Sequence, residues 1–90
     1  MRERDVEAAL IAAVQAAGGL ALKFTSPGRR SVPDRVVILP GLPVTFVECK
    51  APGAKLTAAQ AREHQRIEKA GGRVFVIDSA ESARRFPGGF

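Results

Sequence analysis

Two apolar runs separated by a short turn constrain the fold of this chain more than any other feature. They span residues 34–39 and 44–50, and the connection between them is Pro40-Gly41-Leu42-Pro43. Runs of this length, joined by proline and glycine, predict an antiparallel hairpin. Both faces of the two strands are apolar, so we expect other elements to cover at least part of each side of the sheet.

Helical and extended patterns alternate in the rest of the chain. Val6, Leu10 and Val14 recur at helical spacing in an alanine-rich segment that Gly18-Gly19 terminates. In order, we expect a helix over 5–17, strands over 20–24, 34–39 and 44–50, a helix over 57–70, a strand over 73–77 and a short final helix over 80–85. The order α-β-β-β-α-β predicts an α/β fold whose last strand joins the sheet through a right-handed crossover.

Size and charge limit the classes of protein to which the chain can belong. Its 90 residues predict a single domain over 1–90 with a modest core, which oligomerisation would supplement. The formal net charge of +5 comes from 14 Lys and Arg against 9 Asp and Glu, and it favours an anionic partner, nucleic acid first. Trp and Tyr are absent and Phe occurs five times, which argues against a base-stacking platform.

The single cysteine and the charged N-terminal segment indicate the compartment. Cys49 alone can form neither an internal disulfide nor a cysteine-based zinc site, which suits a reducing cytoplasm. Residues 1–5 carry four charges, and no long apolar span follows them. We therefore expect neither a signal peptide nor a membrane segment.

The strongest candidate site combines Asp34 with Glu48 and Lys50. Glu48 and Lys50 are two residues apart, so on a strand they share a face, where ionised groups are costly unless they are paired, hydrated or bound to a metal. The hairpin would bring Asp34 near Glu48, and two carboxylates with the backbone carbonyl of Cys49 would suit Mg²⁺. Alternatively, Asp34 caps a turn and Glu48 pairs with Lys50 at an exposed strand end, and the spacing leaves both interpretations open.

Lys50 and Glu7 each have two possible roles at this site. The Lys50 ammonium would orient or activate a water molecule and stabilise developing charge, or else it is a solvated strand-end lysine. Glu7 lies on the apolar stripe of the first helix, so it faces inward and needs a partner such as a metal ion or a lysine. Alternatively, Glu7 lies at the edge of the stripe and interacts with the positive N-terminal end of the helix dipole. Glu3, one turn earlier, is the fallback.

Gln60 has two compatible roles at the start of the second long helix. Thr57 and Gln60 match a capping box, in which the glutamine side chain binds back to the Thr57 amide. Gln60 also shares a helical face with His64 and Ile67, so it could hold a phosphate or a metal-bound water molecule. A histidine such as His64 is more often packed or solvated than catalytic.

A basic loop precedes Asp34. Glycine lets the backbone approach a phosphate closely, and paired arginines clamp phosphate oxygens. The alternative is an ordinary basic surface loop. The candidate DNA-binding residues are Lys23, Ser26, Gly28, Arg29 and Arg30. On the second long helix, Arg62, Arg66 and Lys69 are expected to form a solvated face.

These features together resemble the VRR-NUC family, a branch of the PD-(D/E)XK nuclease superfamily. The resemblance covers nearly the whole chain in the right order. The segments that carry it are Glu7 on the first helix, Gly18-Gly19, and residues 23–35, 46–53 and 56–60, which include Pro33-Asp34 and Glu48-Cys49-Lys50. The side chain of Cys49, at a position often occupied by an apolar residue, should point away from the site.

The resemblance implies both a fold and an activity. The implied fold is the PD-(D/E)XK, restriction-endonuclease-like core, α-β-β-β-α-β, with a mixed central sheet flanked by helices. The implied activity is Mg²⁺- or Mn²⁺-dependent DNA endonuclease action, with an active-site set of Glu7, Asp34, Glu48, Lys50 and Gln60. Small stand-alone viral and bacterial members form homodimers and cut branched DNA such as four-way (Holliday) junctions, which makes a phage origin a natural expectation.

Two other functions are compatible with the same fold. A catalytically silent DNA-binding module would keep the basic surface, but it has no need of clustered carboxylates facing phosphates. A purely structural subunit would need neither the acidic cluster nor the basic loop beside it. The carboxylate pair Asp34 and Glu48, together with Lys50, therefore favours the nuclease over both alternatives.

Overall fold

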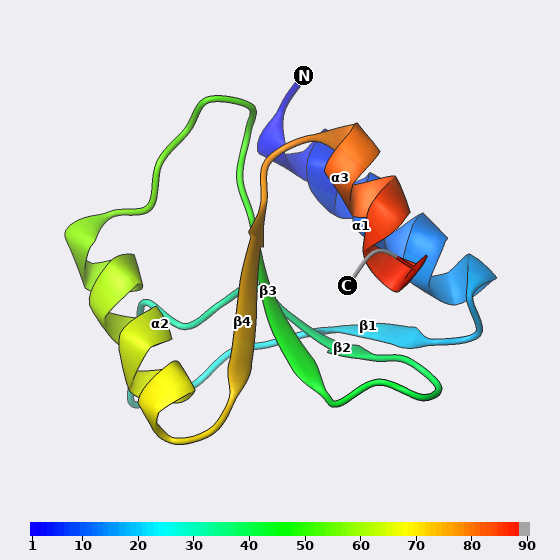
Figure 1. Ribbon diagram of the computed structural model, residues 1–90. Coiled ribbons are helices and arrows are strands. Elements are labelled where there is room, and N and C mark those ends of the chain that lie inside the picture. Colours follow the sequence, from blue (N-terminus) through cyan, green and yellow to red (C-terminus); the bar gives the residue numbers. More distant parts are fainter. Residues whose placement is uncertain (89–90) are drawn as a thin grey trace.

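Four strands form one mixed sheet in the computed structural model, which describes residues 1–88 (Figure 1). The elements follow the predicted order. They are α1 (Glu3–Ala16), β1 (Leu20–Lys23), β2 (Arg35–Ile38), β3 (Thr45–Cys49), α2 (Ala58–Lys69), β4 (Arg73–Ile77), α3 (Ala80–Arg85) and the short 3-10 turn η1 (Phe86–Gly88). The strands lie in the order β1-β2-β3-β4.

The predicted hairpin is present. Strand β2 pairs antiparallel with both β1 and β3, and β3 pairs parallel with β4 after the crossover through α2. The strands are shorter than predicted by one residue at several ends. At the start of β2, for example, the Asp34 side chain accepts a hydrogen bond from the Cys49 backbone N–H at 3.1 Å, where a regular ladder would use a carbonyl oxygen.

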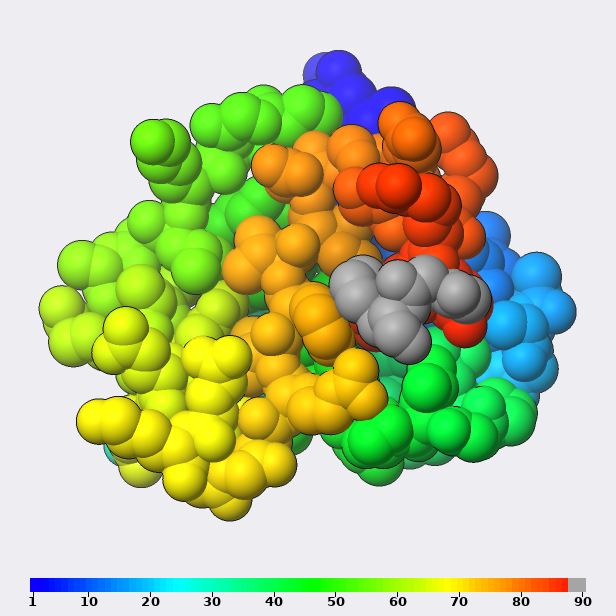
Figure 2. All heavy atoms as spheres, viewed as in Figure 1, coloured from blue at the N-terminus to red at the C-terminus, as the bar shows by residue number. Residues whose placement is uncertain are grey.

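Helices cover both faces of the sheet. Helices α1 and α3 lie on one face and α2 lies on the other (Figure 1). In the space-filling view, β4 (orange) separates α2 (yellow-green to yellow) from α3 (red), and part of α1 (blue) is visible beyond α3 (Figure 2). Helices therefore cover at least part of each face, as the apolar strands predict, but several apolar side chains on the α2 face stay exposed.

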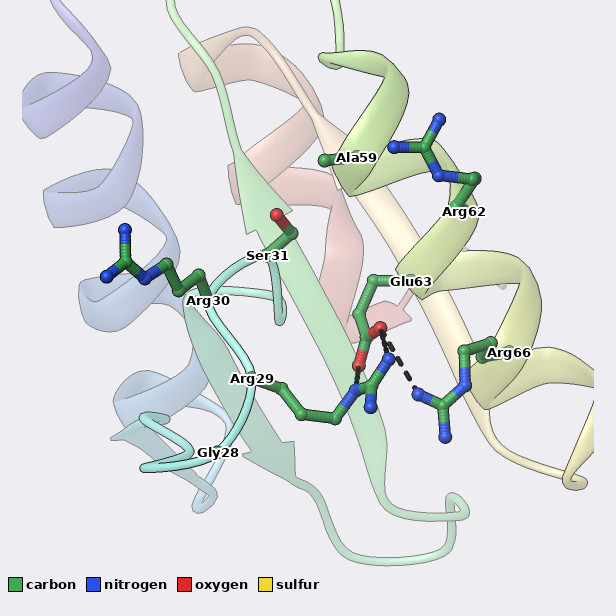
Figure 3. A pocket seen from close by; sticks show the side chains of 8 residues that line it. All are labelled: Gly28, Arg29, Arg30, Ser31, Ala59, Arg62, Glu63 and Arg66. Carbon is green, nitrogen blue, oxygen red and sulfur yellow. Dashed lines mark hydrogen bonds and ion pairs between the residues drawn. The ribbon is translucent and has the colours of Figure 1, made fainter.

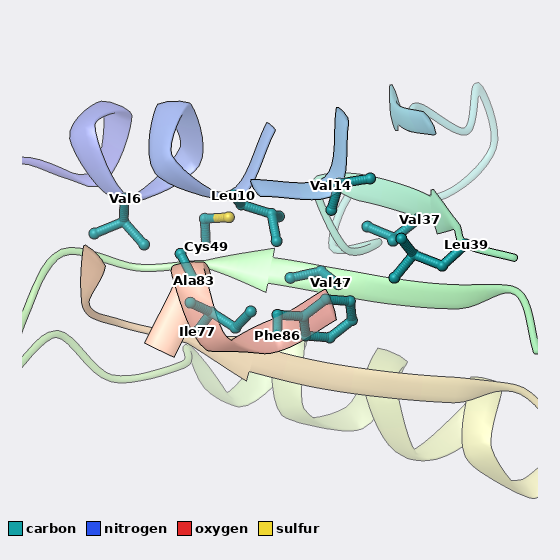
Figure 4. Close-up of a cluster of buried hydrophobic side chains, with 10 residues drawn as sticks. All are labelled: Val6, Leu10, Val14, Val37, Leu39, Val47, Cys49, Ile77, Ala83 and Phe86. Carbon is teal, nitrogen blue, oxygen red and sulfur yellow. The ribbon is translucent and has the colours of Figure 1, made fainter. Parts of the chain in front are cut away.

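The core fills the space between α1, α3 and the sheet (Figure 4). Val6, Leu10 and Val14 are fully buried on the predicted stripe of α1. The Cys49 side chain lies among them, on the face of β3 that points away from α2, as predicted. The core cluster consists of Val6, Leu10, Val14, Val37, Leu39, Val47, Cys49, Ile77, Ala83 and Phe86.

Helix α2 is attached differently, because its buried residues are Glu63 and His64 rather than apolar side chains. Its N-terminus is closed by the predicted capping box: Thr57 Oγ1 accepts from the Gln60 N–H at 3.1 Å, and Gln60 Oε1 accepts from the Thr57 N–H at 3.0 Å. Among residues 1–88, no helix has the length and apolar character to cross a membrane.

Candidate active site

Asp34 and Glu48 meet where β2 and β3 end. Arg35 pairs with Val47 in the β2–β3 register, so one further step places Asp34 opposite Glu48 on the same face of the sheet. Glu48 is 2% exposed, which leaves its carboxylate largely shielded from water between the sheet and α2. The hairpin therefore places the Asp34 and Glu48 carboxylates side by side, as its predicted pairing requires.

The shared position of the two carboxylates changes the acidity of Glu48. Its pKa is raised from 4.5 to about 8, chiefly by burial and then by the charge of Asp34 and a hydrogen bond with it. The positive charge of Lys50 lowers the pKa of Glu48 but does not offset these effects. Near neutral pH the free protein therefore keeps a proton on this pair, as is typical of two carboxyl groups that share a site.

His64 on α2 is the third group at this position. Its Nε2 lies 3.6 Å from Glu48 Oε1, and neither of these buried atoms has a hydrogen-bond partner in the described part of the chain. Burial lowers the pKa of His64, and the charge of Lys50 lowers it further. From the sequence alone, His64 is expected to be packed or solvated rather than catalytic. Its position one turn after Gln60 on the same helical face is the sequence feature that indicates a place near the site.

Lys50 directly follows β3, and its backbone N–H donates to the Ile77 carbonyl at 2.9 Å. Its positive charge lowers the pKa values of both Glu48 and His64. The half-buried lysine thus acts electrostatically on the same groups as Asp34 does.

Two carboxylates of the first helix, Glu3 and Glu7, act on different groups. Glu7 faces inward as expected, but its Oε2 accepts from Arg35 Nε at 3.0 Å, so an arginine takes the place of the expected metal ion or lysine. Glu3 is instead the helix carboxylate whose charge raises the pKa of Glu48. The structure thus brings Glu3, the fallback residue, into electrostatic contact with the acidic pair.

The basic loop lies beside this site. A hollow of about 330 Å³ is lined by Asp34 together with Lys23, Ser26, Arg29 and Arg30, four of the five predicted DNA-binding residues. Some of the hydrogen-bond donors of Arg29 are already used, because its Nε and Nη2 donate to the Glu63 carboxylate at 2.6 and 2.9 Å. At Gly28, an added Cβ would meet no atom within 4 Å, so the fold itself does not require a glycine there.

The donor set fits a hard divalent cation. Within residues 1–88, the His, Cys, Asp and Glu side chains form no group of three or more that could hold a metal ion. Mg²⁺ commonly takes only one or two carboxylates and completes its shell with water and substrate phosphate. Glu48, whose buried Oε1 has no hydrogen-bond partner within residues 1–88, and Asp34 form such a pair of carboxylates. A cation would offset both the burial of the Glu48 charge and its repulsion by Asp34, which together raise the pKa of Glu48.

Comparison with known proteins gives the same assignment. No family model matches the chain. A phage protein named "Putative nuclease p44", from Acyrthosiphon pisum secondary endosymbiont phage 1, is 49% identical over 87 residues, which are 97% of this chain and 94% of that protein. A solved structure described as "VRR_NUC domain" superimposes with a TM-score of 0.85 at 34% identity, covering 98% of this chain and 97% of the other. The chain therefore belongs to the VRR-NUC family of nucleases, which have the PD-(D/E)XK core.

Proposed function

We propose that this nuclease is a Mg²⁺-dependent endonuclease that hydrolyses phosphodiester bonds in DNA, with Mn²⁺ as a substitute. One observation carries the proposal: the Glu48 carboxylate is buried beside Asp34 and within the electrostatic reach of Lys50, and its Oε1 has no hydrogen-bond partner within residues 1–88. Burying a carboxyl group on an apolar strand has a cost to stability that a function would explain.

Asp34, Glu48 and the backbone carbonyl of Cys49 would hold the cation. When bound, Mg²⁺ supplies Lewis-acid stabilisation of a phosphate and acidification of water. A third carboxylate would come from the first helix, either Glu7, which the sequence resemblance indicates, or Glu3, whose charge acts on Glu48. An experiment can separate these two alternatives, because Glu7 also has a structural partner in Arg35, whereas Glu3 lies at the exposed start of α1.

Lys50 and Gln60 would act on the substrate side. The Lys50 ammonium would orient the attacking water molecule and stabilise charge that develops on the phosphate. Gln60 uses its amide oxygen in the capping box, and its amide nitrogen still has hydrogens to donate to a phosphate or a water molecule. Gln60 would thus cap α2 and contact the substrate with different atoms.

We propose branched DNA, such as a four-way junction, as the substrate and a homodimer as the active form. The four apolar side chains Leu20, Leu22, Ile38 and Val44 are 39–55% exposed, and they belong to β1, β2 and the residue before β3. Leu20 pairs with Ile38 across the sheet, so they form one surface. Contiguous apolar surface supports association, and a two-fold dimer would present two active sites to a two-fold junction. The phage relative supports action in the cytoplasm of a bacterial host, and a phage origin.

A cleavage assay tests the proposal. A labelled four-way junction and a linear duplex of matched sequence are incubated with the protein in Mg²⁺, Mn²⁺ or EDTA. We expect cation-dependent cutting of the junction, and its loss in Asp34→Ala and Lys50→Ala proteins that keep the wild-type circular dichroism spectrum. Junction binding without cutting in either cation would identify a silent binding module. Cutting in EDTA would exclude the metal-dependent mechanism.

The same assay separates the two helix carboxylates. If Glu3 serves the site, Glu3→Gln lowers the cleavage rate and leaves the unfolding midpoint near the wild-type value. Glu7→Gln breaks the ion pair with Arg35, so it lowers the unfolding midpoint. A Glu3→Gln protein that cuts at the wild-type rate, beside an inactive but folded Glu7→Gln protein, would assign the role to Glu7.

A further inference from the structure

A second hollow lies between the basic loop and α2, on the α2 face of the sheet (Figure 3). Its volume is about 380 Å³, and we call it the arginine cleft. Four of its eight lining residues are arginines, and one is a carboxylate. The residues of the arginine cleft are Gly28, Arg29, Arg30, Ser31, Ala59, Arg62, Glu63 and Arg66. The formal charge of the lining is therefore +3.

Glu63 organises two of these arginines. Its side chain is 9% exposed, and it accepts from Arg29 at 2.6 and 2.9 Å while Arg66 Nη1 lies 3.5 Å away. The hydrogen bond from Arg29 lowers the pKa of Glu63, so the carboxylate stays ionised at neutral pH. The Arg29 and Arg66 side chains remain 49% and 57% exposed, which leaves guanidinium N–H groups available at the mouth of the cleft.

The other two arginines have no ion-pair partner within residues 1–88. Arg62 extends from α2, whereas Arg30 points away from α2 (Figure 3). Arg29 and Arg30 line both the arginine cleft and the hollow beside Asp34. Positively charged residues therefore extend from α2 along the loop to the acidic pair. The lining of the arginine cleft contains no aromatic residue.

We propose that Arg62 and Arg66 bind phosphate groups of the DNA strand that leads into the active site. The inference rests on the proposed nuclease function and gives a role to two residues for which the helix pattern alone predicts only solvation. Guanidinium groups match phosphate oxygens in pairs, and Glu63 sets the position of Arg66 before DNA binds. Because the remaining lining side chains are small, the cleft contacts the sugar-phosphate backbone and does not discriminate bases.

The test compares two double variants. Arg62→Gln/Arg66→Gln removes two charges from the cleft, and Arg84→Gln/Arg85→Gln removes two exposed charges from α3 on the opposite face of the sheet. Binding to a labelled duplex is measured in EDTA over a range of salt concentrations. We expect the cleft variant to bind at least about tenfold more weakly, with a slope of log Kd against log salt reduced by roughly one per lost phosphate contact. The α3 variant should match the wild type.

Further variants keep folding and charge effects apart. Arg62→Gln alone disturbs no ion pair, so it should fold like the wild type and still bind duplex more weakly. Arg62→Lys/Arg66→Lys should restore most of the salt slope but not the full affinity, because lysine keeps the charge and loses the planar fork. The affinity lost in the glutamine variants should be equal for duplexes of unrelated sequence.

The outcomes also distinguish this inference from the nuclease proposal. Wild-type cutting in Mg²⁺, with equal Kd and salt slope for the wild type and the cleft variant, would overturn the cleft and leave the nuclease proposal intact. Equal losses in the cleft and α3 variants would also overturn it. A wild-type protein that binds duplex through Arg62 and Arg66 but cuts nothing would retain the cleft and reject the catalytic proposal.

Discussion

At the scale of single residues, burial decides what Glu48 can do. A carboxylate with 2% exposure beside Asp34 holds a proton that an exposed glutamate would lose. The same burial puts Cys49, on the opposite face of β3, among apolar side chains and raises the pKa of its thiol to about 12. One strand thus carries a carboxyl group of raised pKa toward α2 and an unreactive thiol toward α1.

The pH dependence of stability tests this description of Glu48. Its folded-state pKa of about 8 lies above the unfolded value near 4.5, so its contribution is fully present below pH 4.5 and is lost as the pH rises through 8. Glutamine imitates the protonated acid at every pH. In EDTA, the unfolding midpoint of Glu48→Gln should therefore exceed that of the wild type at pH 8, and the difference should shrink toward pH 4.5.

Glu63→Gln is the matched control, since the pKa of Glu63 is lowered by its hydrogen bond with Arg29. Its contribution is present above the unfolded pKa and lost on acidification, so this variant should be less stable than the wild type at pH 8. A Glu48→Gln protein that is also less stable than the wild type at pH 8 in EDTA would contradict the raised pKa of Glu48, which burial and the charge of Asp34 produce.

At the scale of elements, the close approach of the α1–β1 connection to β2 needs a glycine. An added Cβ at Gly19 would lie 2.5 Å from the Ile38 carbonyl oxygen and 2.7 Å from Leu39 Cδ2. The backbone oxygen cannot move without disturbing the pairing of β2. An added Cβ at Gly28 in the basic loop would meet open space instead, so the fold requires a glycine at position 19 but not at position 28.

Gly19→Ala should therefore destabilise the protein by about 1–3 kcal/mol, the usual cost of overpacking a close contact. Gly28→Ala should leave the free energy of unfolding nearly unchanged. Urea titrations of the two variants measure the difference. Equal stabilities for both would mean that the α1–β1 connection adjusts more freely than the structure indicates.

The elements could be predicted because their signals are local. The apolar stripe of α1, the Thr57–Gln60 capping box and the turn between β2 and β3 each depend on residues near one another in sequence. The Asp34–Glu48 pair followed because a hairpin fixes which residues face each other. The partners of Glu7, His64 and Arg29 could not be read in this way, because they depend on how each helix is placed against the sheet.

At the scale of the whole molecule, the sheet is covered unevenly. The core lies on the face of α1 and α3, whereas α2 leaves the apolar side chains of β1 and of the turn end of the β2–β3 hairpin exposed on the other face. A chain of 90 residues with one-sided apolar packing gains from burying such a surface against a second copy.

A charge placed in this exposed surface should therefore prevent association. We expect Leu22→Glu to be monomeric by light scattering at micromolar concentration, where we propose that the wild type forms a dimer. Gln15→Glu adds a similar charge on the exposed side of α1, and it should leave the dimer intact. A monomeric wild type under the same conditions would remove the dimer and the paired incisions that depend on it.

The polar attachment of α2 has a consequence for how the molecule opens. Helix α1 is held by Val6, Leu10 and Val14, but α2 buries only Glu63 and His64. Amide hydrogens of α2 should therefore exchange with deuterium sooner than those of α1, through a local opening that leaves the core folded. Because α2 carries His64, Gln60 and one wall of the arginine cleft, that opening would reversibly separate the proposed active-site residues. DNA bound in the cleft, as we propose, would slow the exchange.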